Sequence, residues 1–249
     1  MKNLIILFAV AAVLYLIGSN FYSNQVGSST HAQEPSGTSS LAATDGSSAT
    51  TSLNLDTIKE LAAKNPIKRT VPEGAIEMKP LIYGDESAPI IIEEFASFTC
   101  SHCANFHREK LPKLKEALID NGIAQLHMYS FVRNAQDLEV TMMIQCQDSN
   151  DARKKFTNAV MNGFEQWTGS DNYQDSLKTI ARVGGMSEEA FDTCVADTAL
   201  QDKLIASRQW FDKQVGVNAT PYFRVGSEVV KGAQGIAEFE TAIQAELAK

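Results

Sequence analysis

The chain has 249 residues, of which 44% are hydrophobic, 21% are charged and 8% are aromatic. This composition is ordinary for a globular protein and excludes collagenous, wholly disordered and multi-span membrane proteins. The 30 acidic residues outnumber the 22 basic ones, and the net charge is −8. No basic cluster is present that could neutralise phosphates, so we expect no nucleic-acid partner.

The N-terminal segment has the pattern of a secretory signal. Lys2 precedes the apolar run 4–17, which is shorter than the ~20 residues that a membrane-spanning helix needs. We predict that residues 1–22 form a signal peptide or, if they are not cleaved, an N-terminal membrane anchor that is the chain's only contact with the membrane. Export would place the cysteines in an oxidising compartment, so we expect a periplasmic location.

The exported part begins with a segment that cannot fold alone. Residues 23–52 consist largely of Ser, Thr, Gly, Ala and Asn, which predicts a flexible linker. A short N-terminal extension follows at 53–77, with a helix predicted over 56–64 and Asp56 as its cap.

The main domain is predicted over residues 78–249 and alternates strands with helices. A long stretch of helical periodicity at about 134–216 interrupts this alternation, and a long helix is predicted to open at Ser187. Strands are expected at 80–83, 90–95, 124–132, 222–225 and 228–230, and further helices at 101–121 and 236–247. This order predicts an α/β core with an all-helical insertion.

Cys100, Ser101, His102 and Cys103 directly follow the predicted strand 90–95 and open a helix. The unpaired N–H groups and the dipole of a helix N-terminus favour a thiolate over a thiol, and His102 can add a positive or hydrogen-bonding partner. We therefore expect a lowered pKa for an exposed, nucleophilic Cys100, with Cys103 as the shielded resolving thiol. The alternatives are half of a metal site or an inert pair, and the strand–CxxC–helix order favours redox chemistry.

Residues 94–103 (EFASFTCSHC), together with the distant Thr220-Pro221 pair, resemble the DsbA-type thiol–disulfide oxidoreductases of the thioredoxin superfamily. The resemblance covers about 78–249. It implies a thioredoxin fold, in which helices flank a central mixed sheet, with a helical subdomain inserted. It also implies dithiol–disulfide exchange, for which we expect neither a bound cofactor nor a metal.

The resemblance assigns roles to several residues around the cysteine pair. His102 corresponds to the position that stabilises the reduced form in oxidising members. Pro221 corresponds to a cis-proline beside the active site, where backbone groups of Thr220 would bind an extended substrate strand. Glu94 corresponds to a partly buried acid that assists proton transfer from the resolving thiol.

Other residues near this site are assigned by position. Glu93 points to the opposite face from Glu94 by strand alternation. Ser101 stands where the best-known member has proline, and Thr220 where it has valine. The resemblance implies that both positions tune the redox potential. His107, one turn beyond Cys103, is expected at the surface.

Cys146 and Cys194 lie within the helical stretch, and each is expected on the apolar face of its helix. In an exported protein such a pair favours a structural disulfide over two buried free thiols, with a stabilisation of about 3–4 kcal/mol. A four-cysteine zinc site is disfavoured because the chain has no second CxxC.

These patterns predict an exported, monomeric thiol–disulfide oxidoreductase that introduces disulfide bonds into newly translocated proteins at Cys100–Cys103. Its partners would be unfolded or partly folded exported proteins with free cysteines and, by the resemblance, a DsbB-like membrane oxidase. One alternative is an isomerase or reductase of exported disulfides. The other is a tethered binding module without enzymatic activity, whose CxxC is structural or binds zinc.

Overall fold

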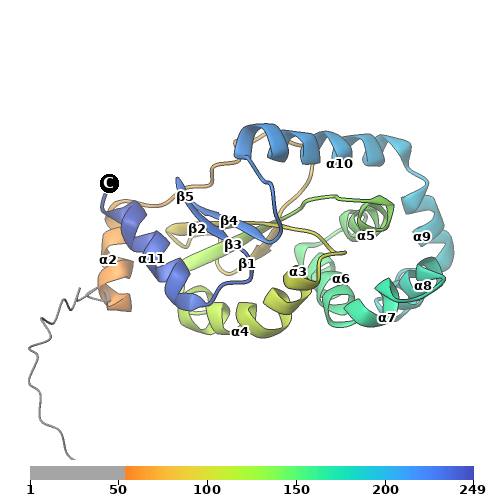
Figure 1. Ribbon diagram of the computed structural model, residues 1–249, viewed down its shortest axis with the longest axis horizontal. Coiled ribbons are helices and arrows are strands. Elements are labelled where there is room, and N and C mark those ends of the chain that lie inside the picture. Colours follow the sequence, from red (N-terminus) through yellow and green to blue (C-terminus); the bar gives the residue numbers. More distant parts are fainter. Residues whose placement is uncertain (1–53) are drawn as a thin grey trace, which may run out of the picture. The chain divides into compact units, whose positions relative to one another are not determined.

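The computed structural model describes residues 54–249 (Figure 1). The predicted signal or anchor at 1–22 and the linker at 23–52 lie outside the described residues. Within the described range, no helix is both long and apolar enough to cross a membrane.

A five-stranded mixed sheet forms the centre of the fold, in the order β1-β3-β2-β4-β5. The central strand β2 pairs in parallel with β3 and antiparallel with β4, and both edge pairs are antiparallel. The strands are β1 (Leu81–Tyr83), β2 (Ile90–Ala96), β3 (Ala124–Ser130), β4 (Tyr222–Val225) and β5 (Glu228–Lys231). All five lie where the sequence predicts strands, and the β-branched residues of β1, β2, β4 and β5 suit a buried pleated surface.

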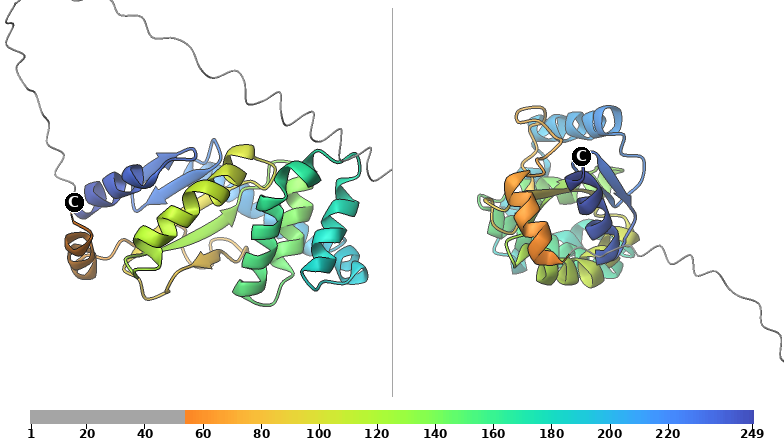
Figure 2. Two further views of the ribbon diagram at one scale, coloured as in Figure 1. Left: turned by 90° about the horizontal axis from the view of Figure 1, so that it is seen from below. Right: turned by 90° about the vertical axis from the view of Figure 1, so that its left-hand side faces the viewer.

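Helices cover both faces of this sheet. One continuous helix follows β2 and lies beside the C-terminal helix. The long helix α10 (Thr198–Trp210) runs along the opposite side (Figures 1 and 2). The helix after β2 consists of α3 (Ser101–Asn105), η1 (Phe106–Lys110), α4 (Leu111–Leu114) and η2 (Lys115–Ile119), and the C-terminal helix is α11 (Ile236–Leu247). Phe106, Phe223 and Phe239 pack their rings together between these helices and the sheet.

The helical insertion lies between β3 and β4 and is seen at one end of the sheet in Figure 2. Its elements are α5 (Ala135–Gln145), α6 (Asn150–Asn162), α7 (Phe164–Thr168), α8 (Tyr173–Val183), α9 (Glu188–Val195), α10 (Thr198–Trp210) and η3 (Phe211–Val215). Phe211 of η3 returns to the sheet and packs against Phe95 and Tyr129. The predicted thioredoxin fold with a helical insertion is thus confirmed.

Two helix boundaries differ from the predictions. The helix that opens after Ser187 ends at Val195, because the Asp197 side chain accepts the N–H of Leu200 and caps a separate helix, α10. The N-terminal helix α2 spans Leu55–Lys64, and its cap is Asn54 instead of Asp56. The amide oxygen of Asn54 accepts the backbone N–H of Asp56 at 3.1 Å.

The N-terminal extension is part of the same core. Ile58 and Ala62 of α2 are fully buried, and Ile67 forms a parallel β-bridge with Ile90. Further along, the buried carboxylate of Glu93 accepts three hydrogen bonds, from the backbone N–H (2.7 Å) and hydroxyl (2.5 Å) of Thr70 and from the N–H of Val71 (2.9 Å). These contacts fasten the extension to the central strand.

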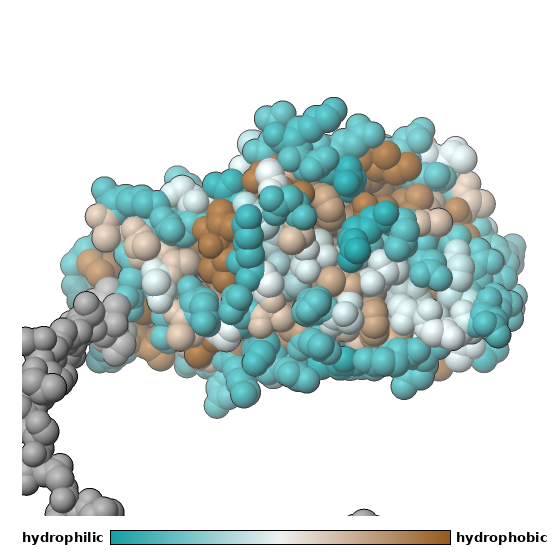
Figure 3. All heavy atoms as spheres, in the orientation of Figure 1, coloured by the Kyte–Doolittle hydropathy of each residue, from teal (hydrophilic) through white to brown (hydrophobic). Residues whose placement is uncertain are grey.

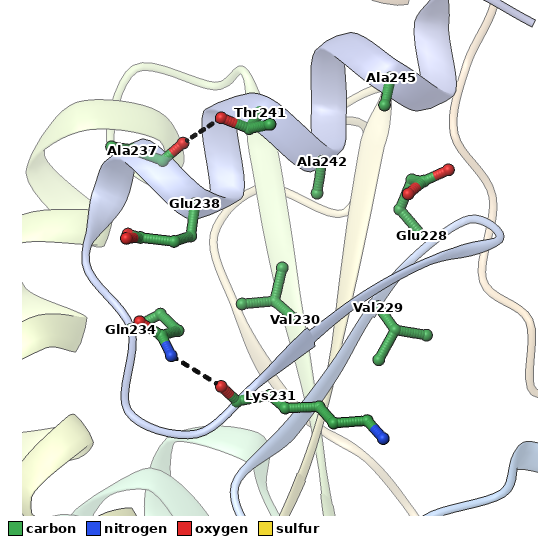
Figure 4. Close-up of a pocket in the computed structure, with 10 residues that line it drawn as sticks. All are labelled: Glu228, Val229, Val230, Lys231, Gln234, Ala237, Glu238, Thr241, Ala242 and Ala245. Carbon is green, nitrogen blue, oxygen red and sulfur yellow. Dashed lines mark hydrogen bonds between the residues drawn. The ribbon is translucent and has the colours of Figure 1, made fainter.

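Four large hydrophobic residues of the described part are exposed: Leu61, Val183, Ile205 and Val229. Figure 3 shows hydrophobic side chains in separate patches among hydrophilic ones on the face that it presents. A hollow of about 420 Å³ lies between β5 and α11, with Val230 and Ala242 on its two walls (Figure 4). Neither cysteine of the CxxC lines this hollow.

Candidate active site

The two CxxC cysteines lie where the central strand passes into the first helix. β2 ends at Ala96, a short turn follows, and Cys100 is the N-cap of α3 with extended backbone angles. The Cys100 N–H bonds to the carbonyl of Ser97 at 3.3 Å. The sulfur atoms therefore lie at a helix N-terminus, with backbone N–H groups directed towards them.

Cys100 is less exposed than the sequence predicts. It retains 7% of its accessible surface, whereas Cys103 retains none, and both are free thiols. The loop that precedes β4 covers Cys100, whose sulfur lies 3.3 Å from the carbonyl oxygen of Thr220 and donates a hydrogen bond to it when protonated. Cys100 nevertheless lines a cavity of about 300 Å³, together with His102, Phe131, Arg133, Asn218, Ala219 and Thr220. An incoming thiol can therefore reach Cys100 through the cavity, whereas Cys103 lies behind it.

The surroundings shift the pKa values of the two thiols in opposite directions. The pKa of Cys100 is lowered to about 4, chiefly by the hydrogen bond from the Cys103 thiol, although burial acts to raise it. Hydrogen bonds from the Thr220 side chain and from the N–H groups of Cys103 and His102 lower this pKa further. Burial raises the pKa of Cys103 well above its usual value, and the charges of Cys100 and Glu94 act in the same direction. The Ser97 N–H, 3.4 Å from the Cys103 sulfur, partly opposes this rise. One thiol is thus an anion at neutral pH and the other is neutral.

A titration of the reduced protein should show this lowered pKa. We expect thiolate ultraviolet absorbance to appear with a midpoint near pH 4 and to be missing in Cys100→Ser. Because an unfolded cysteine titrates at about pH 8.5, ionised Cys100 stabilises the folded reduced form in full above that pH. This stabilisation falls with decreasing pH and is lost below about pH 4. A midpoint near that of an ordinary cysteine would contradict the arrangement.

His102 and Ser101 are both exposed. His102 acts on Cys100 through its backbone N–H and is one of the residues that line the cavity beside the sulfur. The peptide bond between Thr220 and Pro221 is cis, and this bond lies in the loop that faces Cys100. The structure therefore brings together the CxxC and the Thr220-Pro221 pair, which are 120 residues apart in sequence.

Beneath the cysteines, Glu94 is fully buried and pairs with His107. The Nε2 atom of His107 lies 3.1 and 3.2 Å from the two carboxylate oxygens of Glu94. The prediction that His107 lies at the surface is wrong, since its side chain is only 2% exposed. The turn of the helix that carries His107 faces β2, so the His107 side chain reaches Glu94.

Cys146 and Cys194 form a disulfide, with their Cα atoms 6.3 Å apart. Cys194 is buried, but Cys146 is exposed and does not lie on the buried face of a helix. α5 ends at Gln145, and Cys146 is its C-cap, so the apolar periodicity of α5 does not extend to this residue. Within residues 54–249, no group of three or more His, Cys, Asp or Glu side chains could hold a metal ion.

Asp137 also belongs to the site, although no sequence pattern predicts this. This residue is 1% exposed, and its carboxylate accepts hydrogen bonds from Ser97 and Thr99, which precede Cys100. The only sequence pattern that includes Asp137 is that of a helix start. Asn134 and Asp137 have the spacing of an N-cap and its third helical residue, and the pattern predicts only the start of α5.

A thioredoxin fold with an inserted helical subdomain, and with a CxxC at the start of the helix after its central strand, is the architecture of DsbA-type proteins. The family model described as Thioredoxin matches residues 77–245, and the chain belongs to this family. The resemblance to DsbA-type oxidoreductases is thereby confirmed.

Relatives and solved structures agree with this assignment. The chain is 25% identical over 167 residues to a "Putative protein-disulfide oxidoreductase" of Rickettsia bellii, covering 67% of this chain and 64% of that protein. A protein of the same description from Rickettsia conorii is 27% identical over 181 residues, covering 72% and 65%. The match thus spans slightly less than two thirds of the length of these relatives. The crystal structure of Wolbachia pipientis alpha-DsbA1 superposes with a TM-score of 0.61 at 26% identity, covering 68% of this chain and 91% of that one.

Proposed function

We propose that this protein is a thiol–disulfide oxidoreductase that introduces disulfide bonds into newly translocated proteins. The observation that carries the proposal is the contrast between the two thiols. The pKa of Cys100 is lowered to about 4, and Cys103 is a fully buried thiol with a raised pKa. An environment that stabilises the thiolate stabilises the reduced protein, so its disulfide is readily given up to substrate thiols.

The reaction follows from this contrast. A substrate thiolate attacks the Cys100 sulfur of the disulfide, and Cys103 leaves and takes up a proton. A second substrate thiolate attacks the substrate sulfur of the mixed disulfide, and Cys100 leaves as a thiolate. The substrate loses two electrons and two protons. The protein gains the two electrons and one of the protons, and the other proton passes to water.

We assign Glu94 a role in the proton transfer at Cys103. Its carboxylate is fully buried, pairs with His107, and its charge raises the pKa of Cys103. A raised pKa favours reprotonation of Cys103 as it leaves. Slower formation of the mixed disulfide in Glu94→Gln would support this role, and an unchanged rate would exclude it.

The substrates in this proposal are unfolded or partly folded exported proteins with free cysteines. They would enter the 300 Å³ cavity beside Cys100, with an extended segment against Thr220 and Pro221. The signal-like pattern at 1–22 supports a periplasmic location. Reoxidation requires an electron acceptor, for which we propose a DsbB-like membrane oxidase.

The test is the equilibrium of the Cys100–Cys103 pair with glutathione at pH 7, together with the oxidation of a peptide that carries two cysteines. We expect the pair to be more oxidising than glutathione and the peptide to become a disulfide. A reducing potential like that of thioredoxin would instead indicate a reductase or isomerase. No exchange, with stoichiometric zinc in the reduced protein, would indicate a binding module.

A further inference from the structure

A buried carboxylate of the helical insertion lies against the turn that carries the cysteines. Asp137 belongs to the first turn of α5 and is 1% exposed. One of its oxygens accepts the hydroxyl of Ser97 at 2.6 Å, the hydroxyl of Thr99 at 3.2 Å and the N–H of Arg133 at 3.0 Å. The other accepts the N–H of Thr99 at 3.0 Å. Four donors from two segments thus converge on one side chain.

Ser97 and Thr99, which are bound by Asp137, fix the positions of the two sulfur atoms. The N–H of Ser97 donates to the Cys103 sulfur at 3.4 Å, and the carbonyl of Ser97 accepts the N–H of Cys100 at 3.3 Å. Thr99 is bonded directly to Cys100. A change in the position of Ser97 or Thr99 therefore moves the backbone around both cysteines.

The arrangement also connects the insertion to the cavity wall. Arg133, whose N–H bonds to Asp137, lines the cavity beside Cys100. Asn134, the N-cap of α5, donates its side-chain amide to the Thr99 hydroxyl at 3.0 Å and accepts the Asp137 N–H at 2.9 Å. The start of α5 and the cysteine turn are consequently held as one unit.

A carboxylate is required for this set of contacts. All four partners are donors, and an amide in the same place would direct its own N–H groups at some of them. Burial raises the pKa of Asp137, and the four hydrogen bonds oppose that rise. Hydrogen bonds to a buried charged acceptor are stronger than those between neutral groups, so the turn is held firmly.

We propose that Asp137 is a positioning residue for the cysteine pair, and that through Ser97 and Thr99 it couples the helical insertion to thiol–disulfide exchange. The effect of Asp137 on disulfide exchange rests on the proposed function, whereas its effect on the pKa of the Cys100 thiol does not. The donors to Cys100 act only at short range and in line, so a displaced turn weakens them. Loss of Asp137 should therefore make the Cys100 thiolate less stable.

The experiment is a titration of reduced Asp137→Asn, with the reaction rate of Cys100 towards a small aromatic disulfide as a second readout. We expect the midpoint of Cys100 to rise by about one pH unit or more, which is a tenfold change in its ionisation equilibrium. Removal of a nearby negative charge alone would lower the midpoint. An unchanged or lowered midpoint would therefore overturn the proposal.

Glu93→Gln is the matched control. Glu93 is also 1% exposed and accepts three hydrogen bonds, but these come from the N-terminal extension and not from the cysteine turn. Both variants should unfold at lower denaturant concentration, and only Asp137→Asn should change the titration. If both variants shift the midpoint equally, general loosening of the fold explains the effect and the proposal is wrong.

A second variant covers the case in which Asp137→Asn does not fold. Ser97→Ala keeps the charge of Asp137 and removes the shortest of its four hydrogen bonds. We expect a smaller shift of the Cys100 midpoint in the same direction, and an unchanged midpoint would contradict the proposal. Wild-type protein that titrates as expected but oxidises no peptide would refute the proposed function alone. Peptide oxidation and titration that are both unaffected in the variants would refute the positioning role alone.

Discussion

Cys103→Ser should accumulate a stable mixed disulfide at Cys100, and Cys100→Ser should lose exchange completely. The reason is the opposite state of the two thiols. With its pKa lowered to about 4, Cys100 is a thiolate at neutral pH and lines the cavity. Cys103 is fully buried and its pKa is raised, so it cannot replace the missing nucleophile.

The measurement is incubation of each reduced variant with glutathione disulfide, followed by mass spectrometry of the intact protein. In Cys103→Ser, the Cys100 thiolate attacks the glutathione disulfide, releases one glutathione thiolate and retains the other glutathione. Wild-type protein resolves this adduct through Cys103 and ends as an internal disulfide. A glutathione adduct on Cys100→Ser, located at Cys103, would reverse the assignment of the two roles.

Removal of the disulfide between Cys146 and Cys194 should cost about 4 kcal/mol of unfolding free energy. The bond closes a loop with a sequence separation of 48 residues, and the chain-entropy model gives about that value for such a loop. This is a large part of the 5–15 kcal/mol that stabilises a typical domain. The double variant Cys146→Ser/Cys194→Ala removes the disulfide with a polar residue at the exposed position and an apolar residue at the buried one.

Urea unfolding of the oxidised proteins measures this difference. After reduction, wild type and variant should have nearly equal stability, since both then lack the cross-link. The Cys100 titration should be unchanged, because the disulfide joins the C-cap of α5 to α9 within the insertion. A stability loss below about 1 kcal/mol would mean that the unfolded chain gains little freedom when the bond is removed.

The sequence alone determined the strands and most helices of the core, because these depend on local patterns. β-branched residues mark β1, β2, β4 and β5, and the CxxC that follows the run 90–95 after a short turn places a thiol at a helix N-terminus. The opposite orientations of Glu93 and Glu94 follow from strand alternation. Cys146 and Cys194 could be paired because an exported chain with two cysteines in one subdomain favours a disulfide.

The side chains that meet beneath and around the cysteines are set by packing between distant segments. His107 is one turn past Cys103, but its burial against Glu94 depends on how the helix packs on β2. Asp137 has the pattern of an ordinary helix start, and its role appears only where α5 approaches Ser97 and Thr99. Periodicity indicates which side of an element is buried, and the partner that covers it is determined by packing between segments far apart in the chain.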